Sequence, residues 1–219
     1  MSIPQTIEFD TRKAKRFHIV CFDLETSGLD LDDHEVIQIG AIKVNESLNR
    51  HVIKSFEMKV RMENPERASP SALKVNRYDL EVWAKEAVSK QEAAIAFAEW
   101  IVDGSDHVKF AGHNLAGFDW PRICRMFERA DTKIMQVRRP RKNQEPEGED
   151  DKGEFIKQAM IPGSGYHSLL DTGPMAAMLQ LAVGQQELGS LSLRPLARYC
   201  GFIHDDDQAH EALYDCMTT

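Results

Sequence analysis

An apolar run at residues 17–22 that ends in two alternating acidic residues constrains this chain most. The run, FHIVCF, is typical of a buried strand. Successive side chains of a strand point to opposite faces, so Asp23 and Glu25 share one face at the strand's exit, while Phe22 and Leu24 share the other. Adjacent carboxylates repel each other unless a cation neutralises them, and oxygen ligands favour Mg²⁺ or Mn²⁺. Taken alone, the two acids are equally consistent with a solvated strand end.

A second acidic position follows another predicted strand. Residues 110–114 have the pattern of a short strand, and the chain then enters a helix whose first turn suits Pro121. Apolar residues repeat at helical spacing and predict the core face of that helix: Trp120, Ile123, Cys124 and Phe127. Asp119 stands at the start of the helix, where an acid either complements the helix dipole or joins an acidic site.

The third informative stretch lies near the end of the sequence. Ala209, Leu213 and Cys216 fit one apolar face of a helix. His210 and Asp215 would project about 140° apart on a continuous helix, because each residue turns the helix by roughly 100°. The two can act together only if Asp215 lies on the helix and His210 precedes it, in a loop or the first turn.

These stretches together resemble a known family. Asp23 and Glu25 in FDLET, Asp119 in HNLAGFD, and His210 with Asp215 in HEALYD resemble, in order, the three motifs of the DEDDh exonucleases. This is the DnaQ-like group of the ribonuclease H-like superfamily. The SGLD, LDT and LRPLARYCG segments are similar to secondary features of that family, and they begin at residues 27, 170 and 193. The resemblance covers about residues 17–219.

The resemblance implies a metal-dependent 3′–5′ exonuclease that uses two divalent ions, Mg²⁺ or Mn²⁺, about 4 Å apart. By resemblance, Asp23 bridges both ions, and Glu25 and Asp215 help to hold the ion that binds the nucleophilic water. Asp119 acts directly or through coordinated water. His210 is the general base, since imidazole titrates near neutral pH.

Two further assignments follow from the same resemblance. A tyrosine four residues before the last acid would mark the sister DEDDy branch, but Glu211 occupies that position, so the histidine branch is indicated. His204 does not have the spacing of the motif. The substrate pocket is expected to involve four residues that flank the acids: Leu24, Thr26, His113 and Asn114. A structural strand-end histidine is the alternative for His113.

The rest of the sequence predicts one α/β domain over residues 1–219, with a mixed central β-sheet flanked by helices, as in ribonuclease H-like folds. Strands are expected at residues 36–44, 51–60 and 108–111, with a hairpin connection at 46–49 and a loop at 65–70. Alanine and large apolar residues at helical spacing predict a helix before the third of these strands: Ala93, Ala94, Phe97, Ala98 and Ile101.

Residues 136–165 depart from the compact family pattern. Between residues 136 and 157 there are six basic and six acidic residues with almost no apolar content. Such a segment cannot build a core, so a solvated, mobile insertion is expected. The alternative is a flap whose basic end, residues 138–142, touches the phosphates of a substrate strand. The chain stops four residues after Asp215, so the helix that carries this residue is expected to be short.

Composition agrees with a cytoplasmic enzyme. The sequence has no apolar run long enough to span a membrane, no signal-peptide pattern and no C-x-x-C pair among its four cysteines. A net charge of −8 disfavours a protein that coats duplex DNA, but an enzyme that trims ends engages few phosphates.

The expected partners are nucleic-acid 3′ ends, single-stranded or frayed, and a polymerase or another replication or repair protein, with no membrane. DNA is favoured as substrate by family frequency. The alternatives are an RNA-trimming exoribonuclease of the same family and a catalytically silent module that binds nucleic acid or a polymerase.

Overall fold

The computed structural model describes residues 5–10, 17–45, 52–105, 107–138, 156–162, 169–184, 188–202 and 211–219. Its strands are β1 (Gln5–Asp10), β2 (Phe17–Thr26), β3 (Val36–Asn45), β4 (Val52–Lys59), β5 (His107–Gly112), β6 (Thr132–Arg138), β7 (Ile156–Ile161) and β8 (Leu169–Asp171). Its helices are η1 (Pro65–Arg67), α1 (Pro70–Val75), α2 (Leu80–Glu86), α3 (Lys90–Val102), α4 (Asp119–Arg129), α5 (Thr172–Val183), α7 (Leu193–Tyr199) and α8 (Ala212–Thr218).

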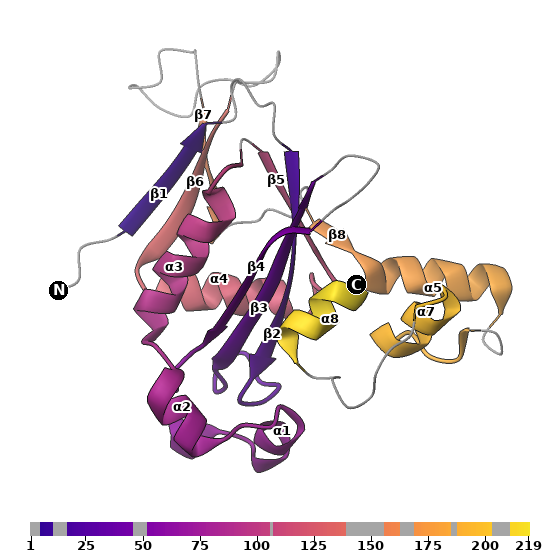
Figure 1. Ribbon diagram of the computed structural model, residues 1–219, viewed down its shortest axis with the longest axis horizontal. Helices are drawn as coiled ribbons and strands as arrows, with labels where there is room; N and C mark the ends of the chain where they lie inside the picture. Colours follow the sequence, from indigo (N-terminus) through magenta and orange to yellow (C-terminus); the bar gives the residue numbers. More distant parts are fainter. Residues whose placement is uncertain are drawn as a thin grey trace.

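The central sheet has five strands in the order β4-β3-β2-β5-β8 (Figure 1). Strands β2, β3 and β4 are antiparallel neighbours, whereas β5 is parallel to both β2 and β8. This mixed sheet, with helices on its faces, confirms the predicted α/β fold class and the predicted strands at 36–44 and 51–60 within a residue or two. The strand predicted from the apolar run at 17–22 is present and continues to Thr26. The expected hairpin at 46–49 lies outside the described residues.

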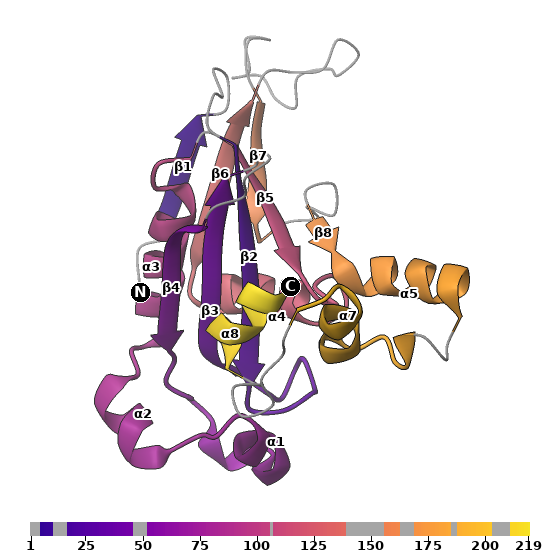
Figure 2. The ribbon, with the colours of Figure 1, turned by 45° about the vertical axis from the view of Figure 1, so that its right-hand side comes forward.

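The two faces of the sheet carry different side chains. Phe22 of β2 points into the main core, where its ring lies 5.9 Å from the ring of Phe97 and 6.0 Å from that of Phe110. Helices α3 and α4 cover this face, whereas α8 lies on the opposite face of β2 and β3 (Figure 2). The five side chains on α3 that were expected to be buried are buried: Ala93, Ala94, Phe97, Ala98 and Ile101. Alternation along β2 therefore sends Asp23 and Glu25 toward α8.

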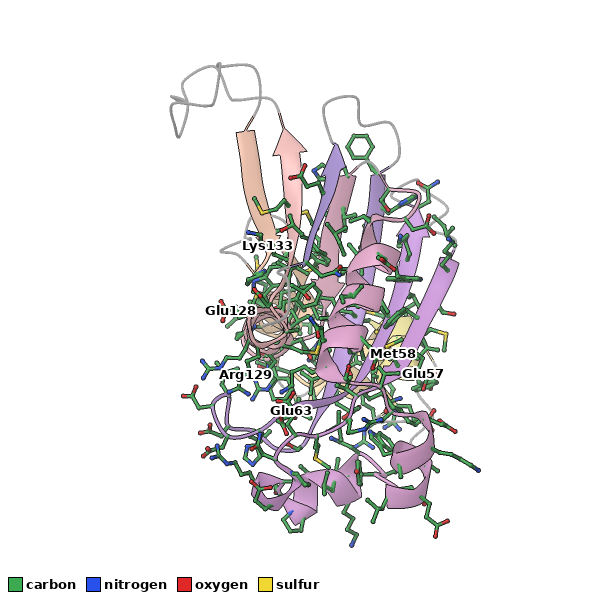
Figure 3. The ribbon with its side chains drawn as sticks, turned by 90° about the vertical axis from the view of Figure 1, so that its left-hand side faces the viewer. Glu57, Met58, Glu63, Glu128, Arg129 and Lys133 are labelled. Atoms are coloured by element: carbon green, nitrogen blue, oxygen red, sulfur yellow. The ribbon has the colours of Figure 1, made fainter. Side chains whose placement is uncertain are left out.

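Figure 3 views the molecule from the side of α3, with Glu57 and Met58 of β4 on one side of that helix. Glu128 and Arg129 at the end of α4, and Lys133 of β6, lie on its other side. Helix α3 begins with a capping box, in which Ser89 accepts the N–H of Glu92 and Glu92 accepts the N–H of Ser89. The capping box stabilises the first turn of the helix, and its buried apolar face packs against the sheet.

Three features differ from the sequence predictions. A second sheet, in the order β1-β6-β7, was not expected. The strand expected at 110–114 ends at Gly112, because Asn114 adopts a left-handed backbone with φ of 57°. The loop expected at 65–70 contains η1 and the start of α1, where Pro70 occupies a first-turn position.

The insertion also differs from its expected boundaries of 136–165. Residues 136–138 belong to β6 and residues 156–161 form β7, whose last residue, Ile161, is fully buried in the core. Residues 139–155, including most of the basic segment, lie outside the described residues, so the flap stays a prediction. No helix within the described ranges is long and apolar enough to cross a membrane.

Candidate active site

Three carboxylates from two elements meet on the α8 face of the sheet. One carboxylate oxygen from each of Asp23, Glu25 and Asp215 lies within 4.8 Å of the other two. Asp23 and Glu25 lie near the C-terminal end of β2. Asp215 lies on α8, which packs over β2 and β3. The sequence predicted these three residues as one group, although 190 positions of sequence separate Glu25 from Asp215.

Asp119 lies beside this group, as the first residue of α4. The backbone N–H of Leu24 donates to Asp119 Oδ1 at 3.1 Å, so the strand between the two β2 acids is tied directly to the fourth acid. Asp119 is buried, and it is not part of the three-residue cluster defined by the 4.8 Å separation. For this hydrogen bond to form, the turn between β5 and α4 must bring the start of α4 against the C-terminal end of β2. The second motif contains that turn.

Burial and mutual repulsion make the ionised forms of these acids costly. Burial, and secondarily Asp215, raise the pKa of Asp23 to about 7. Burial, Asp23 and Asp215 raise the pKa of Glu25 to about 9. Burial and Asp23 raise the pKa of Asp119 well above its usual value. A set of close, partly desolvated carboxylates with only oxygen donors fits hard divalent cations such as Mg²⁺ or Mn²⁺. The carboxylate oxygens of this site therefore suit Mg²⁺ or Mn²⁺ as ligands.

A cavity of about 460 Å³ opens beside the acids. Asp23, Glu25 and Asp215 line one part of it, and Leu24 and Thr26, which were expected in the pocket, also line it. The remaining lining residues come from the loop after β2, the segment around α1, and the turn before α4: Gly28, Leu29, Ser69, Ser71, Ala72, Val75, Asn76 and Phe118. These remaining residues were not predicted, because no local pattern in residues 69–76 indicates that α1 folds back toward β2.

His113 and Asn114 are not among the residues that line this cavity. The Nδ1 atom of His113 lies 3.0 Å from the hydroxyl of Thr172, the first residue of α5, and burial lowers the pKa of His113.

Asn114 is exposed, and its carbonyl accepts the N–H groups of Gly117 and Phe118. Asp171 serves a similar structural purpose, because its carboxylate accepts the N–H groups of Ala116 and Gly173. The conformation of the turn before α4 thus depends on these residues.

Arg122 organises two walls of the cavity. Its guanidinium donates to the backbone carbonyl of Phe118 at 3.0 Å and to that of Leu29, and its Cζ atom lies 3.6 Å from the centre of the Phe118 ring. Both partners line the cavity, yet one follows β2 and the other precedes α4. A buried arginine that joins two backbone segments fixes their separation with directed hydrogen bonds. Apart from its position on α4, no sequence pattern indicates this role of Arg122.

An ion-pair network centred on the buried residues Lys90 and Glu35 holds the third wall. Lys90 at the start of α3 pairs with Glu35 at 2.9 Å and with Glu63 at 2.6 Å, and Glu63 lies at the lower end of α3 in Figure 3. Glu35 also accepts the N–H groups of Glu63 and Asn64, which lead toward α1. At the other end of this segment, the side chain of Asn76 donates to the carbonyl of Thr26 at 2.8 Å. The network holds α1 near the exit of β2.

The histidine of the third motif is the part of the predicted site that the structure does not describe. His210 and His204 lie outside the described residues. Helix α8 begins at Ala212, with Glu211 as its N-cap residue, and Arg77 pairs with Glu211 at 3.5 Å. Asp215 thus lies on a helix that starts after position 210, which is the arrangement that the geometry of the motif requires.

Comparison with protein families gives a match to the RNase_T exonuclease model over residues 20–145, which is more than half of the chain. The chain belongs to the RNase_T exonuclease family. This is the DEDDh, DnaQ-like group that the motifs predicted. No curated protein matches the chain by sequence.

Solved structures of exonuclease I share the fold of this RNase_T family member. The zinc-bound complex of the Escherichia coli enzyme with single-stranded DNA has a TM-score of 0.65 and 16% identity, and the alignment covers 93% of this chain and 39% of that one. Exonuclease I from Methylocaldum szegediense has a TM-score of 0.60 and 18% identity, with 92% and 38% covered. A complex of exonuclease I with the SSB C-terminus has a TM-score of 0.63 and 15% identity, with 93% and 40% covered. The chain therefore spans about two-fifths of the length of these proteins.

Proposed function

We propose that this chain is a metal-dependent 3′–5′ exonuclease that removes nucleotides from single-stranded or frayed DNA ends. The observation that carries the proposal is the convergence of Asp23, Glu25 and Asp215 within 4.8 Å beside a 460 Å³ cavity. Two divalent ions, when bound, supply activation of a water molecule and relief of charge on the leaving 3′ oxygen. The three clustered carboxylates would hold these ions, with Asp119 beside them.

The chain's own residues supply binding and orientation. Carboxylates and the apolar side chains of Leu29, Val75 and Phe118 both line the cavity, so it offers surface for a phosphodiester with its cations and surface for a base. Arg122 fixes the position of Leu29 and Phe118, and Asn76 fixes α1 against Thr26. Because these contacts hold the cavity walls in place, the loop after β2 and the turn before α4 need not move at each turnover to bring the scissile bond near the carboxylates.

His210 would accept the proton of the attacking water as general base. It immediately precedes Glu211, the N-cap residue of α8, so one residue separates it from the first residue of the helix that carries Asp215. The complexes of exonuclease I with dT13 and dA16 oligonucleotides support single-stranded DNA as the substrate class. A polymerase or another replication or repair protein as partner stays a prediction.

A second substrate class is favoured by one observation, since the matching family model carries the name of a ribonuclease. An RNA-trimming enzyme would use the same acids and would differ in contacts to the 2′-hydroxyl. The test compares kcat/KM on single-stranded DNA, duplex DNA and single-stranded RNA of one sequence in Mg²⁺ and in Mn²⁺. We expect single-stranded DNA to be the best substrate. A higher kcat/KM on RNA would overturn the DNA assignment and leave the exonuclease assignment in place.

A further inference from the structure

Helix α8 brings Asp215 to the site, and Gly40 of β3 lies directly beneath that helix. Gly40 is the cross-strand partner of Asp23 in the β2–β3 ladder. Side chains of directly paired residues point to the same face of a sheet, so a side chain at position 40 would point toward α8, as Asp23 does. The thiol of Cys216, the residue after Asp215, donates to the carbonyl of Gly40 at 3.2 Å. Strand β3 is therefore in direct contact with the helix turn that carries the third carboxylate.

The approach of α8 to Gly40 leaves no room for a side chain. A Cβ atom built on Gly40 would lie 2.3 Å from the carbonyl carbon of Ala212, 2.3 Å from the amide nitrogen of Leu213 and 2.7 Å from the Cβ of Ala212. The first two are backbone atoms, and no rotamer change can move them. A methyl group at position 40 would have to push α8 outward by about 1 Å, because close-packed interiors have no void to absorb it.

Backbone conformation does not explain the glycine. Gly40 has ordinary strand geometry and is not among the described glycines with positive φ, which are Gly104, Gly184, Gly189 and Gly201. Glycine inside a strand weakens it, and its presence commonly marks a place where another backbone approaches closely. Here that backbone is the first turn of α8.

We propose that Gly40 is a positioning residue of the carboxylate site: its missing side chain lets α8 lie close enough to β3 for Asp215 to join Asp23 and Glu25. The inference rests on the proposed function for its catalytic consequence. Asp215 stands one turn along α8 from the contact, and α8 is anchored elsewhere by a small apolar cluster of Cys21, Ile42 and Cys216. Displacement of the first turn therefore moves the Asp215 carboxylate away from its two partners.

The test is the Gly40→Ala variant of the full chain, with Mn²⁺ binding measured by titration calorimetry alongside activity. We expect Mn²⁺ affinity to fall about 10–100-fold, the usual effect of disturbing residues that orient metal ligands. We expect kcat to fall on the order of 10²-fold, since a shift near 1 Å at a reacting centre has that effect. The Mn²⁺ concentration for half-maximal activity should rise in parallel with the loss of affinity.

Two further variants separate positioning from general destabilisation. Ile39→Val removes a methyl group from the core face of β3, on the side of the strand opposite Gly40 and α8, so it should lower the melting temperature and leave Mn²⁺ affinity as in the wild type. Ala212→Val adds bulk to the same contact from the helix side and leaves β3 unchanged, so it should reproduce the loss of Mn²⁺ affinity even if Gly40→Ala does not fold.

Amide hydrogen exchange across residues 212–218 gives a readout that does not depend on activity, and both displacing variants should exchange faster there than the wild type. Wild-type Mn²⁺ affinity and exchange in Gly40→Ala and Ala212→Val would overturn the positioning role. A wild-type chain that neither binds Mn²⁺ nor cleaves nucleic acid would instead refute the proposed function, and the exchange rates would still decide whether Gly40 seats α8.

Discussion

Replacing Asp23 by Asn is expected to lower kcat on the order of 10⁴-fold, a loss typical of removing a central group of a hydrolytic site. Among the three clustered carboxylates, Asp23 alone raises the pKa of both Glu25 and Asp119, so its charge acts on both of the other acids. Asn preserves the shape of the side chain but not the charge that the cations require. The measurement is single-turnover cleavage of a labelled oligonucleotide in saturating Mg²⁺, with circular dichroism to show that the fold is intact.

The same substitution is expected to stabilise the metal-free protein. The Asp23 pKa of about 7 in the folded state exceeds the ordinary value of 3.8, so between these pH values the folded chain binds the proton that the unfolded chain has lost. Stability therefore falls as pH rises through this window, and Glu25 extends the fall toward pH 9. At pH 8, Asp23→Asn should add on the order of 2 kcal/mol, or about 4–8 °C in Tm for a chain of this size.

Melting curves in EDTA at pH 5 and pH 8 check this result, and the gain should be smaller at pH 5. Asp30→Asn is the matched control, because hydrogen bonds from the N–H groups of Asp33 and Asp32 lower the pKa of Asp30. That substitution should give no gain. A Tm that falls by many degrees for Asp23→Asn at pH 8 would mean that Asp23 has a structural role, and that this role outweighs the cost of its burial and of repulsion within the cluster.

Replacing His210 by Ala is expected to lower kcat by roughly 10²–10⁴-fold, the usual contribution of a positioned proton acceptor. Metal affinity should change little, because Asp23, Glu25 and Asp215 are untouched. The acidic limb of the pH–rate profile should lose the titration of the imidazole, and raising the pH should partly restore the rate as hydroxide replaces the missing base. Pre-steady-state rates across a pH series measure both effects.

His204→Ala is the control for this prediction and should have little effect. The two histidines lie six positions apart in one segment between α7 and α8, so they share local sequence and differ in spacing from Asp215. A larger loss for His204→Ala than for His210→Ala would show that the third motif is misaligned.

The parts of the fold that the sequence predicts are those with a strong local pattern. The apolar run before Asp23 identifies β2, and the spacing of Ala93, Phe97 and Ile101 identifies α3, because each pattern has the period of its own element. The acids were predictable for the same reason: alternation on β2 fixes the face of Asp23 and Glu25 relative to Phe22.

The remaining features depend on contacts between distant segments. Strand β1 pairs with β6, and Gln5 and Thr132 are register partners far apart in the sequence, so neither strand carries a local sign of the other. The bonds of Arg122 to Leu29 and Phe118 require the turn after β2 to meet the start of α4. Gly40 is similar, since a glycine in a strand pattern does not say which backbone lies above it. Long-range packing decides these features, and one sequence does not encode it in a readable pattern.

The central claim is metal-dependent removal of nucleotides from the 3′ end, and one assay tests it most directly. Single-stranded DNA labelled at its 5′ end is incubated with the wild-type chain in Mg²⁺, in Mn²⁺ and in EDTA, beside the same strand closed into a circle, with Asp23→Asn as the control for contaminating nucleases. We expect a descending ladder of labelled products with either metal, and no cleavage in EDTA or of the circle. Undiminished activity in EDTA, cuts in the circle, or immediate release of a labelled mononucleotide from the 5′ end would contradict the account.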